Sequence, residues 1–280
     1  MWKTLLKFIA FLLIGYLFIV GLITLLQNQM IFHPSDDIWD TPERLDVPWS
    51  EHRVEAPDGL LLHGWMIGEY ESEDKPVVVY SHGNAGNISG RVEIAGVIAN
   101  QGAAVFLYDY RGYGKSDGSP TEEGIYVDGK AVVDYLRDEL EIPLNRMIFY
   151  GQSLGGAVAA RQAAEFESSG LVLHSAFLSG KEVATDIYPF IPRFLVSADF
   201  PVNEDLRQAK TERIMIMHSR NDRIVPYRHG KELRRIATED PANYVTFVEL
   251  RGGHNTGFSQ SREIYARKWA EFISVVDSRE

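Results

Sequence analysis

The order of apolar and polar positions predicts strands alternating with helices after residue 48. Apolar runs of strand length occupy residues 76–82, 103–110, 147–150, 171–174, 213–218 and 244–250. Such runs are typical of strands that are buried on both faces. Helices are expected at residues 89–99, 121–139, 227–236 and 261–275, with a further one directly after Ser153. This alternation indicates a mostly parallel sheet covered by helices on both faces.

Three other segments depart from that rhythm. Residues 53–56 and 60–67 flank the turn sequence Pro57-Asp58-Gly59 and predict a hairpin of two antiparallel strands. Residues 30–48 are expected to pack irregularly across the domain, and residues 176–211 interrupt the pattern without a predicted element. At the helix beginning at residue 89, Ser89 is the expected N-cap.

The N-terminal apolar run is long enough to cross a bilayer as one helix. Residues 8–26 carry no charge, Lys3 and Lys7 precede them, and three aspartates follow within residues 27–40. This asymmetry places the N-terminus in the cytoplasm and the main domain across the membrane, in a periplasm or a lumen. A cleavable signal peptide is the alternative, but the run is long for one and no A-x-A-like site follows. We therefore expect a signal anchor at residues 1–27 and a folded domain at residues 28–280.

Composition narrows the class of protein. The chain has 280 residues, 45% of them hydrophobic, no cysteine and a formal net charge of −11. About 250 residues outside the anchor suffice for one large α/β domain; two smaller domains are possible, but no linker or repeat favours them. The acidic balance argues against nucleic acid as a partner, and the lack of cysteine excludes disulfides, thiolate chemistry and cysteine-ligated zinc.

The segment Gly151-Gln152-Ser153-Leu154-Gly155-Gly156 joins a predicted strand to a predicted helix. A sharp turn there would strain the backbone at Ser153, so the positions two before and two after it could carry almost no side chain. Ser153 would then present its hydroxyl at the end of the sheet. An idle serine in a glycine-rich turn remains the alternative, because G-x-S-x-G alone is a weak signal.

The ends of other strands supply partners for Ser153. His254 and Asp222 each follow a predicted strand, as does the glycine-rich sequence HGNAGN at residues 82–87. The carboxyl ends of parallel strands meet at one edge of a sheet, and the chain order serine, acid, histidine is the one this architecture requires. We therefore expect Ser153 as nucleophile, His254 as base and Asp222 as acid.

Simpler roles for these residues remain open. His254 could be a solvated loop histidine, and Asp222 an N-cap or turn residue. Asp199 and Asp205, in the irregular segment, are weaker candidates for the acid.

The oxyanion formed during acyl transfer needs preorganised donors. The backbone N–H groups of Leu154 and Asn84 are the expected pair, since Gly83 and Gly86 let their loop approach closely. The competing interpretation, a phosphate-binding loop, lacks both the Lys-Ser/Thr ending and the dinucleotide spacing.

Several other polar residues are expected to be structural. Asp109, Arg111 and Asp117 fit a strand-end turn with an ion pair, and His82 could brace the oxyanion loop. The histidines in or beside apolar strands are expected to be satisfied core residues, because no metal-ligand spacing joins them. They are His63, His174 and His218.

The motifs GQSLGG, HGNAGN, DYRGYGKSDG, RNDRIVP and GGHN together resemble the α/β-hydrolase superfamily, and within it the membrane-anchored bud-emergence-suppressor-like serine hydrolases. The resemblance covers nearly the whole chain. It implies an α/β-hydrolase fold, Ser153, Asp222 and His254 as catalytic residues, and the amides of Asn84 and Leu154 as oxyanion hole. It also implies a lid at about residues 176–211 and no cofactor or metal. The chain lacks the HGGG motif of the lipase subgroup, and its serine separates it from the branch with an aspartate nucleophile.

The expected function is hydrolysis of carboxylic esters or thioesters through an acyl-enzyme. An amidase or peptidase with the same residues is one alternative, and a non-catalytic binding protein on the same fold is another. The lid segment contains many apolar residues, so it could line an acyl pocket or rest near the bilayer. An ordinary satellite core is an equal alternative.

Overall fold

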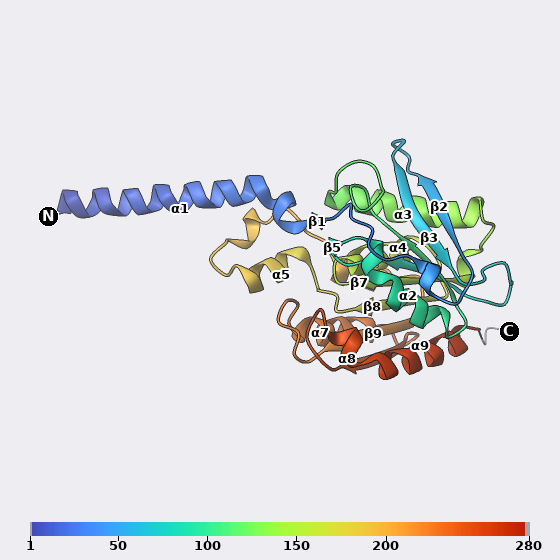
Figure 1. Cartoon of the computed structure of the whole chain (residues 1–280). Helices are drawn as coiled ribbons and strands as arrows, with labels where there is room; N and C mark the ends of the chain where they lie inside the picture. Colours follow the sequence, from blue (N-terminus) through green and yellow to red (C-terminus); the bar gives the residue numbers. More distant parts are fainter. Residues whose placement is uncertain (1, 278–280) are drawn as a thin grey trace.

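The computed structural model describes residues 2–277, with ten strands in two sheets (Figure 1). The strands are β1 (His33–Pro34), β2 (Trp49–Glu55), β3 (Leu61–Ile67), β4 (Val77–Ser81), β5 (Ala85–Gly86), β6 (Ala104–Tyr108), β7 (Met147–Gln152), β8 (Gly170–His174), β9 (Arg213–Ser219) and β10 (Tyr244–Leu250). The α-helices are α1 (Trp2–Ile31), α2 (Val92–Ala99), α3 (Glu122–Asp138), α4 (Gly155–Glu165), α5 (Gly180–Ile187), α6 (Val202–Arg207), α7 (Arg228–Ala237), α8 (Gly257–Gln260) and α9 (Arg262–Asp277).

The main sheet has eight strands in the order β10-β9-β8-β7-β4-β6-β3-β2. The pairs from β10 to β6 are parallel, whereas β3 pairs antiparallel with both β6 and β2. The second sheet is the short parallel pair β1-β5. The predicted hairpin and the predicted α/β-hydrolase fold, with its mostly parallel sheet, are therefore confirmed.

Helices cover both faces of the sheet, and the strands supply a buried layer to each. Along β4, Val77 and Val79 pack toward α3, α4 and α7, whereas Val78 and Tyr80 pack toward α2 and α9. This alternation is the period of two that a strand imposes. Because both faces are covered, all five residues of β4 are buried, as its continuous apolar run predicted.

Some sequence expectations were wrong in detail. The side chain of Asn87, not Ser89, caps the turn that begins the first helix of the sheet domain: its Oδ1 accepts from the Ser89 amide at 2.9 Å. Strand β2 begins at Trp49, before the expected hairpin strand, because its ladder with β3 continues to the pair Trp49 and Ile67. The segment 176–211 contains α5, α6 and a 3₁₀ turn at Arg193–Leu195, so it is not irregular throughout.

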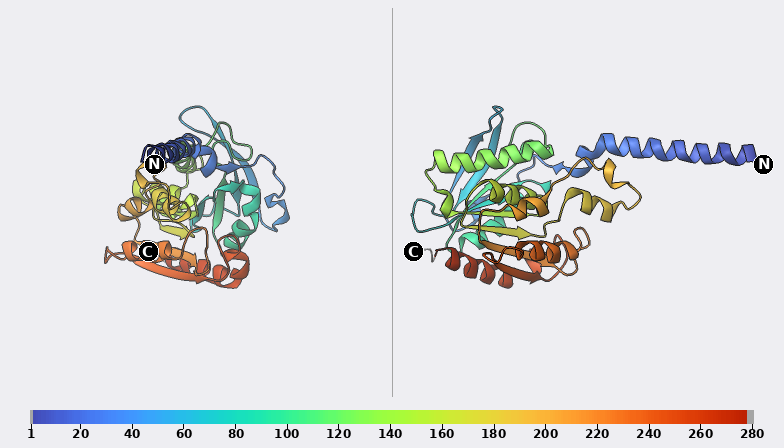
Figure 2. Two further views of the ribbon diagram at one scale, coloured as in Figure 1. Left: turned by 90° about the vertical axis from the view of Figure 1, so that its left-hand side faces the viewer. Right: turned by 180° about the vertical axis from the view of Figure 1, so that it is seen from behind.

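Helix α1 projects away from the sheet domain, and the described C-terminal end of the chain lies on the opposite side (Figures 1 and 2). By length and composition its residues Trp2–Gln27 are apolar enough to span a membrane. The helix continues four residues past the predicted anchor boundary, to Ile31. The half of α1 from Tyr16 onward contacts the domain, and strand β1 follows it, so α1 is a candidate transmembrane span attached to the sheet domain by its C-terminal half.

The expected structural ion pair is present, but the partner of Arg111 lies outside its motif. Arg111 binds the fully buried carboxylate of Asp128 through Nε and Nη2, at 2.9 and 2.7 Å from Oδ1, and also contacts Asp58. Asp117 instead accepts from the Leu61 amide. Burial raises the pKa of Asp128, against the opposing effect of its hydrogen bonds with Arg111.

Replacing Arg111 with methionine should lower the free energy of unfolding by about 3 kcal/mol, because it leaves the Asp128 carboxylate buried without a cation. Urea denaturation in detergent measures this loss. Adding Asp128→Asn to the same chain should recover part of the stability. A loss below about 1 kcal/mol in the single variant, the range of an exposed pair, would contradict the importance of this ion pair.

Candidate active site

Ser153 lies on a strained turn between β7 and α4. Its φ of 52° falls in the left-handed region, which residues with a side chain rarely adopt. The flanking glycines leave no room for side chains: a Cβ at Gly151 would lie 2.2 Å from the carbonyl oxygen of Gly155, and one at Gly155 would lie 2.0 Å from that of Ser81. The strain and the crowding predicted from the sequence are therefore both present.

Gly155→Ala should lower the free energy of unfolding by about 3 kcal/mol or prevent folding, because the new methyl group meets backbone that cannot move aside. Gly90→Ala is the matched control, since its Cβ would have only the ring of Trp39 nearby, at 3.7 Å. Thermal unfolding of both variants gives the comparison. Equal stability of the two would contradict the described packing of the turn.

The structure brings Ser153, His254 and Asp222 together at the carboxyl ends of the strands. His254 Nε2 lies 3.0 Å from Ser153 Oγ, and His254 Nδ1 lies 2.7 Å from Asp222 Oδ2. His254 follows β10 and Asp222 follows β9. Three segments that are far apart in the chain therefore form one hydrogen-bonded row.

Asp222 is held as an acceptor. Its Oδ1 accepts from the amides of Ile224 and Val225, at 3.0 and 2.8 Å, and Oδ2 faces His254. Burial alone would raise the pKa of Asp222, but the hydrogen bond with His254 and the Val225 amide outweigh it and lower the pKa. An ionised Asp222 can only accept, so Nδ1 of His254 carries the proton and Nε2 is free to accept from Ser153.

These contacts bear on the simpler roles of His254 and Asp222. His254 is not a solvated loop histidine, since both ring nitrogens have partners. Asp222 does form a local turn through the amides, and it also contacts His254, so the turn does not rule out its expected role as acid. The rival acids point elsewhere: Asp199 pairs with Lys181, and Asp205 pairs with Arg161.

Asn84 and Leu154, the expected oxyanion donors, line the same cavity as Ser153. Within residues 2–277 neither backbone N–H donates to a protein acceptor. A Cβ on the neighbouring Gly83 would lie 3.6 Å from Ser153 Cβ, so this loop approaches the serine closely. The side-chain Oδ1 of Asn84 is occupied by the His33 amide and the Tyr113 hydroxyl. Both amides therefore lack a protein acceptor in the described structure, as the expected oxyanion role requires.

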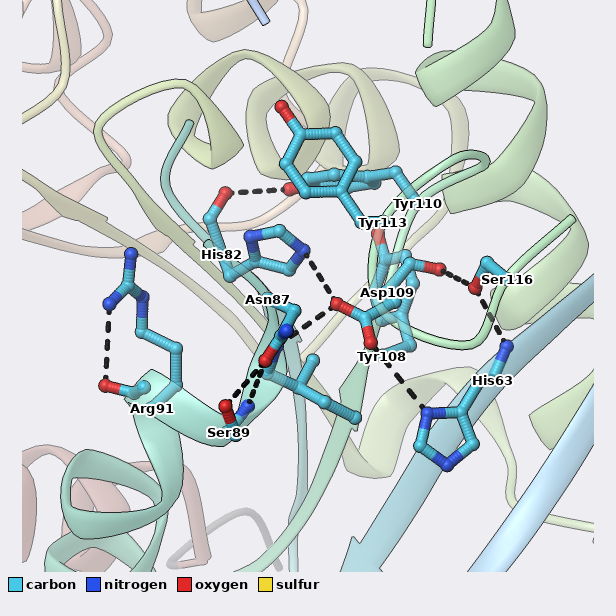
Figure 3. Close-up of polar contacts among 12 residues, drawn as sticks. His63, His82, Asn87, Ser89, Arg91, Tyr108, Asp109, Tyr110, Tyr113 and Ser116 are labelled. Atoms are coloured by element: carbon cyan, nitrogen blue, oxygen red, sulfur yellow. Dashed lines mark hydrogen bonds and ion pairs between the residues drawn. The ribbon is translucent and has the colours of Figure 1, made fainter. Parts of the chain in front are cut away.

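A buried polar cluster braces the loop that carries Asn84 (Figure 3). His82 Nδ1 is 2.7 Å from the Gly83 carbonyl oxygen, and its other side faces Asp109 at 3.4 Å. Asp109 also accepts from the Ile88 amide, and the Tyr110 hydroxyl donates to the His82 carbonyl. The expected bracing role of His82 is thus matched by its contacts, and Asp109 belongs to the same cluster.

The remaining strand histidines are buried, but they are not fully satisfied. His63 Nδ1, His174 Nε2 and His218 Nδ1 have no hydrogen-bond partner among the described residues. His174 lies against the turn, since its carbonyl oxygen accepts from the Ser153 amide. Burial, together with the nearby His254, lowers the pKa of His174 to about 3, so its ring is neutral at physiological pH.

The cavity above Ser153 has a volume of about 490 Å³, within the range of small-molecule sites. The sheet domain supplies Gly83, Asn84, Ser153, Leu154 and His254. Its other walls include residues of the lid segment, which the sequence offered as a possible pocket lining, and of the end of α1, which it did not predict. Arg91 also lines it and was missed, although it stands only four residues after the oxyanion loop.

Comparison with known proteins places the chain in a family. A profile described as Serine aminopeptidase, S33 matches residues 72–206. An uncharacterized protein of Mycobacterium tuberculosis (strain CDC 1551 / Oshkosh) is 32% identical over 239 residues, covering 84% of each chain. Protein bem46 of Schizosaccharomyces pombe is 31% identical over 194 residues, which are 66% of this chain and 64% of bem46. The chain belongs to the bud-emergence-suppressor-like α/β hydrolases.

A solved structure of another protein has the same fold as this α/β hydrolase. An esterase of Pyrococcus furiosus superposes with a TM-score of 0.74, covering 89% of this chain and 98% of the esterase at 20% sequence identity. That likeness concerns the fold. The family match supports hydrolase activity as the coarse function of this chain.

Proposed function

We propose that this α/β hydrolase is a membrane-anchored serine hydrolase that cleaves carboxylic esters or thioesters through an acyl-enzyme. The observation that carries the proposal is the position of His254, hydrogen-bonded to Ser153 on one side and to Asp222 on the other, at the floor of the cavity. A serine hydroxyl needs such a base to become a nucleophile at neutral pH.

In the proposed reaction Ser153 Oγ attacks the carbonyl carbon of the substrate while its proton passes to His254 Nε2. Asp222 stabilises the imidazolium, and the amides of Asn84 and Leu154 donate to the developing oxyanion. The bond to the leaving alcohol or thiol then breaks, and that group takes the proton from His254. Water repeats the sequence on the acyl-enzyme, releasing the acid and restoring the Ser153 hydroxyl. No step of this scheme draws on a cofactor or metal.

We further propose that residues 1–27 form the anchor and residues 28–280 the hydrolase domain, with the lid at 176–211. The lysines before the apolar run favour a cytoplasmic N-terminus and a periplasmic or lumenal domain. In cell fractionation, we expect the protein to keep its N-terminus and to sediment with membranes. A soluble form beginning near residue 28 would instead indicate a cleaved signal peptide.

The substrate bond can be tested with matched compounds. The full-length protein in detergent should hydrolyse an ester and a thioester with one shared acyl group, and the matched amide far more slowly, because an amine leaves poorly without protonation. Hydrolysis of the amide at a comparable rate would favour the amidase alternative. Turnover of none of the three would favour a non-catalytic role.

A further inference from the structure

The end of α1 forms one wall of the cavity above Ser153. Ile23, Met30 and Ile31 of α1 line it, facing lid residues such as Val183 and Ile187. The cavity therefore has a polar floor at Ser153 and an apolar upper part between the anchor helix and the lid. A cavity of about 490 Å³ with this polarity suits an amphiphilic molecule rather than a wholly polar one.

Polar contacts tie α1 to the lid at this wall. Gln27 Nε2 donates to the Leu195 carbonyl at 2.7 Å, and Gln27 Oε1 accepts from both the amide and the hydroxyl of Ser197 at 2.8 Å. About three turns nearer the N-terminus of α1, the Tyr16 hydroxyl donates to the Phe190 carbonyl. Most of the hydrogen bonds between the anchor helix and the lid thus use backbone groups of the lid, together with the Ser197 hydroxyl.

The lid exposes large apolar side chains beside the anchor helix. Phe194 is 84% exposed and Phe190 is 58% exposed, with Ile187 and Tyr188 also partly exposed. All views place this segment on the side of the domain from which α1 projects (Figure 2). When α1 spans a bilayer, the hydrogen bond between Tyr16 and Phe190 holds these side chains beside the apolar part of the membrane, where apolar exposure is favourable.

We propose that the cavity receives the acyl chain of a membrane-resident lipid ester directly from the bilayer, between α1 and the lid. The anchor helix is then part of the acyl-binding site as well as a tether. This inference rests on the proposed ester hydrolysis at Ser153. It names the substrate class of that site as long-chain acyl esters held in a membrane.

An acyl-chain series tests this wall. Ile23→Trp places a larger side chain in the upper cavity, whereas Leu22→Trp adds the same side chain at a neighbouring position outside the cavity lining, 46% exposed. Full-length protein in vesicles of neutral phospholipid is assayed with esters of one alcohol carrying short or long acyl chains. Ile23→Trp should lower kcat/KM about tenfold for long chains and leave short chains unchanged, with Leu22→Trp close to wild type.

The outcomes separate this inference from the proposed function. Wild-type turnover of the esters without any chain-length effect of Ile23→Trp overturns the acyl wall alone. Equal losses in Ile23→Trp and Leu22→Trp also overturn it, since the effect would then not come from the cavity. Absence of turnover in wild-type protein overturns the ester hydrolase itself.

Arg91 is a cation that lines the same cavity. Its Nη2 donates to the Ala85 carbonyl at 3.1 Å and its Nη1 to the Gly90 carbonyl at 3.3 Å (Figure 3). Its buried Nε has no hydrogen-bond partner within the described part of the chain. No carboxylate pairs with it among residues 2–277, although the chain has an excess of acidic residues. A half-buried guanidinium without a counter-ion is costly unless an anion binds beside it.

Arg91 is also close to the reacting group. Its Nη2 is 3.7 Å from the Cβ position of Gly83, which in turn is 3.6 Å from Ser153 Cβ. We infer that Arg91 binds a phosphate or carboxylate carried by the substrate near its ester bond. This second inference also rests on ester hydrolysis at Ser153, but it is independent of the acyl wall.

Matched anionic and neutral esters test the role of Arg91. With one acyl group and alcohols that differ only in a phosphate or a carboxylate, Arg91→Met should lower kcat/KM for both anionic esters by roughly 10- to 100-fold and spare the neutral one. Loss for only one of the two identifies which anion is bound. Arg91→Lys should recover part of the loss. Arg44→Met, at an arginine outside this cavity that pairs with Asp40, is the control.

Two results would overturn the anion site. The first is an equal fall for anionic and neutral esters in Arg91→Met, which would mark Arg91 as a support for the loop through its bond to Ala85. The second is an unchanged ratio of anionic to neutral turnover. Wild-type protein that turns over no ester would instead reject the proposed function.

Discussion

Replacing Ser153 with alanine should lower kcat for the best ester by about a millionfold, leaving only the contribution of binding and the oxyanion donors. The expectation follows from the proposed role of Ser153 as the sole acceptor of the acyl group. The folded state should be retained, because alanine is smaller than serine and adds no atom to the crowded turn. Single-turnover and steady-state assays on full-length protein measure the effect, with circular dichroism to verify folding.

Residues that act as a unit give non-additive losses. His254→Ala should cost nearly as much as Ser153→Ala, and the double variant should be little worse than either single one. A double variant whose loss equals the product of two large independent losses would contradict a shared step. A Ser153→Ala variant that keeps a hundredth of the wild-type rate would indicate that another residue is the nucleophile.

Asp222→Asn should lower kcat by about ten-thousandfold while keeping the hydrogen-bonded row intact. An amide at this position can donate to His254 Nδ1, which stabilises the tautomer with its proton on Nε2 and removes the acceptor for the Ser153 hydroxyl. The loss should appear in kcat rather than KM, because the substituted side chain does not touch the substrate. A pH–rate profile and steady-state kinetics measure it.

The matched control is Asp205→Asn, at the acid that the sequence left as a weaker candidate. Asp205 pairs with Arg161, and neither residue lines the cavity above Ser153, so its replacement should leave kcat within about threefold of wild type. If Asp222→Asn and Asp205→Asn had similar small effects, the base would be oriented by some other group.

The sequence predicted the parts of the fold that depend on local pattern. The apolar runs located the strands, because strands buried on both faces need continuous apolar residues. Because the carboxyl ends of parallel strands meet at one edge of a sheet, the sequence alone predicts that Ser153, Asp222 and His254 lie close together. The glycines around Ser153 could be interpreted because a tight turn has no room for a Cβ.

Features that depend on tertiary contact could not be predicted in this way. In the sequence, Gln27 looks like the polar end of an anchor. Only the structure shows that its side-chain amide accepts a hydrogen bond from the lid backbone at Ser197. The ladder between β2 and β3 extends to Trp49 because pairing, not apolar pattern, sets its length. The partner of Arg111 is Asp128 in the following helix α3, and the spacing of the two residues in the sequence does not reveal such a pair. The sequence does not show that Arg91 lacks a carboxylate partner in the described structure, because that depends on tertiary contacts.

Labelling with a fluorophosphonate tests the central claim most directly. This probe forms a covalent adduct with an activated serine hydroxyl, and peptide mass spectrometry of the full-length protein then locates the adduct. The account predicts one adduct, on Ser153, which is absent in Ser153→Ala and greatly slowed in His254→Ala. An unlabelled Ser153 in protein that still hydrolyses esters, or an adduct on a different serine, would contradict it.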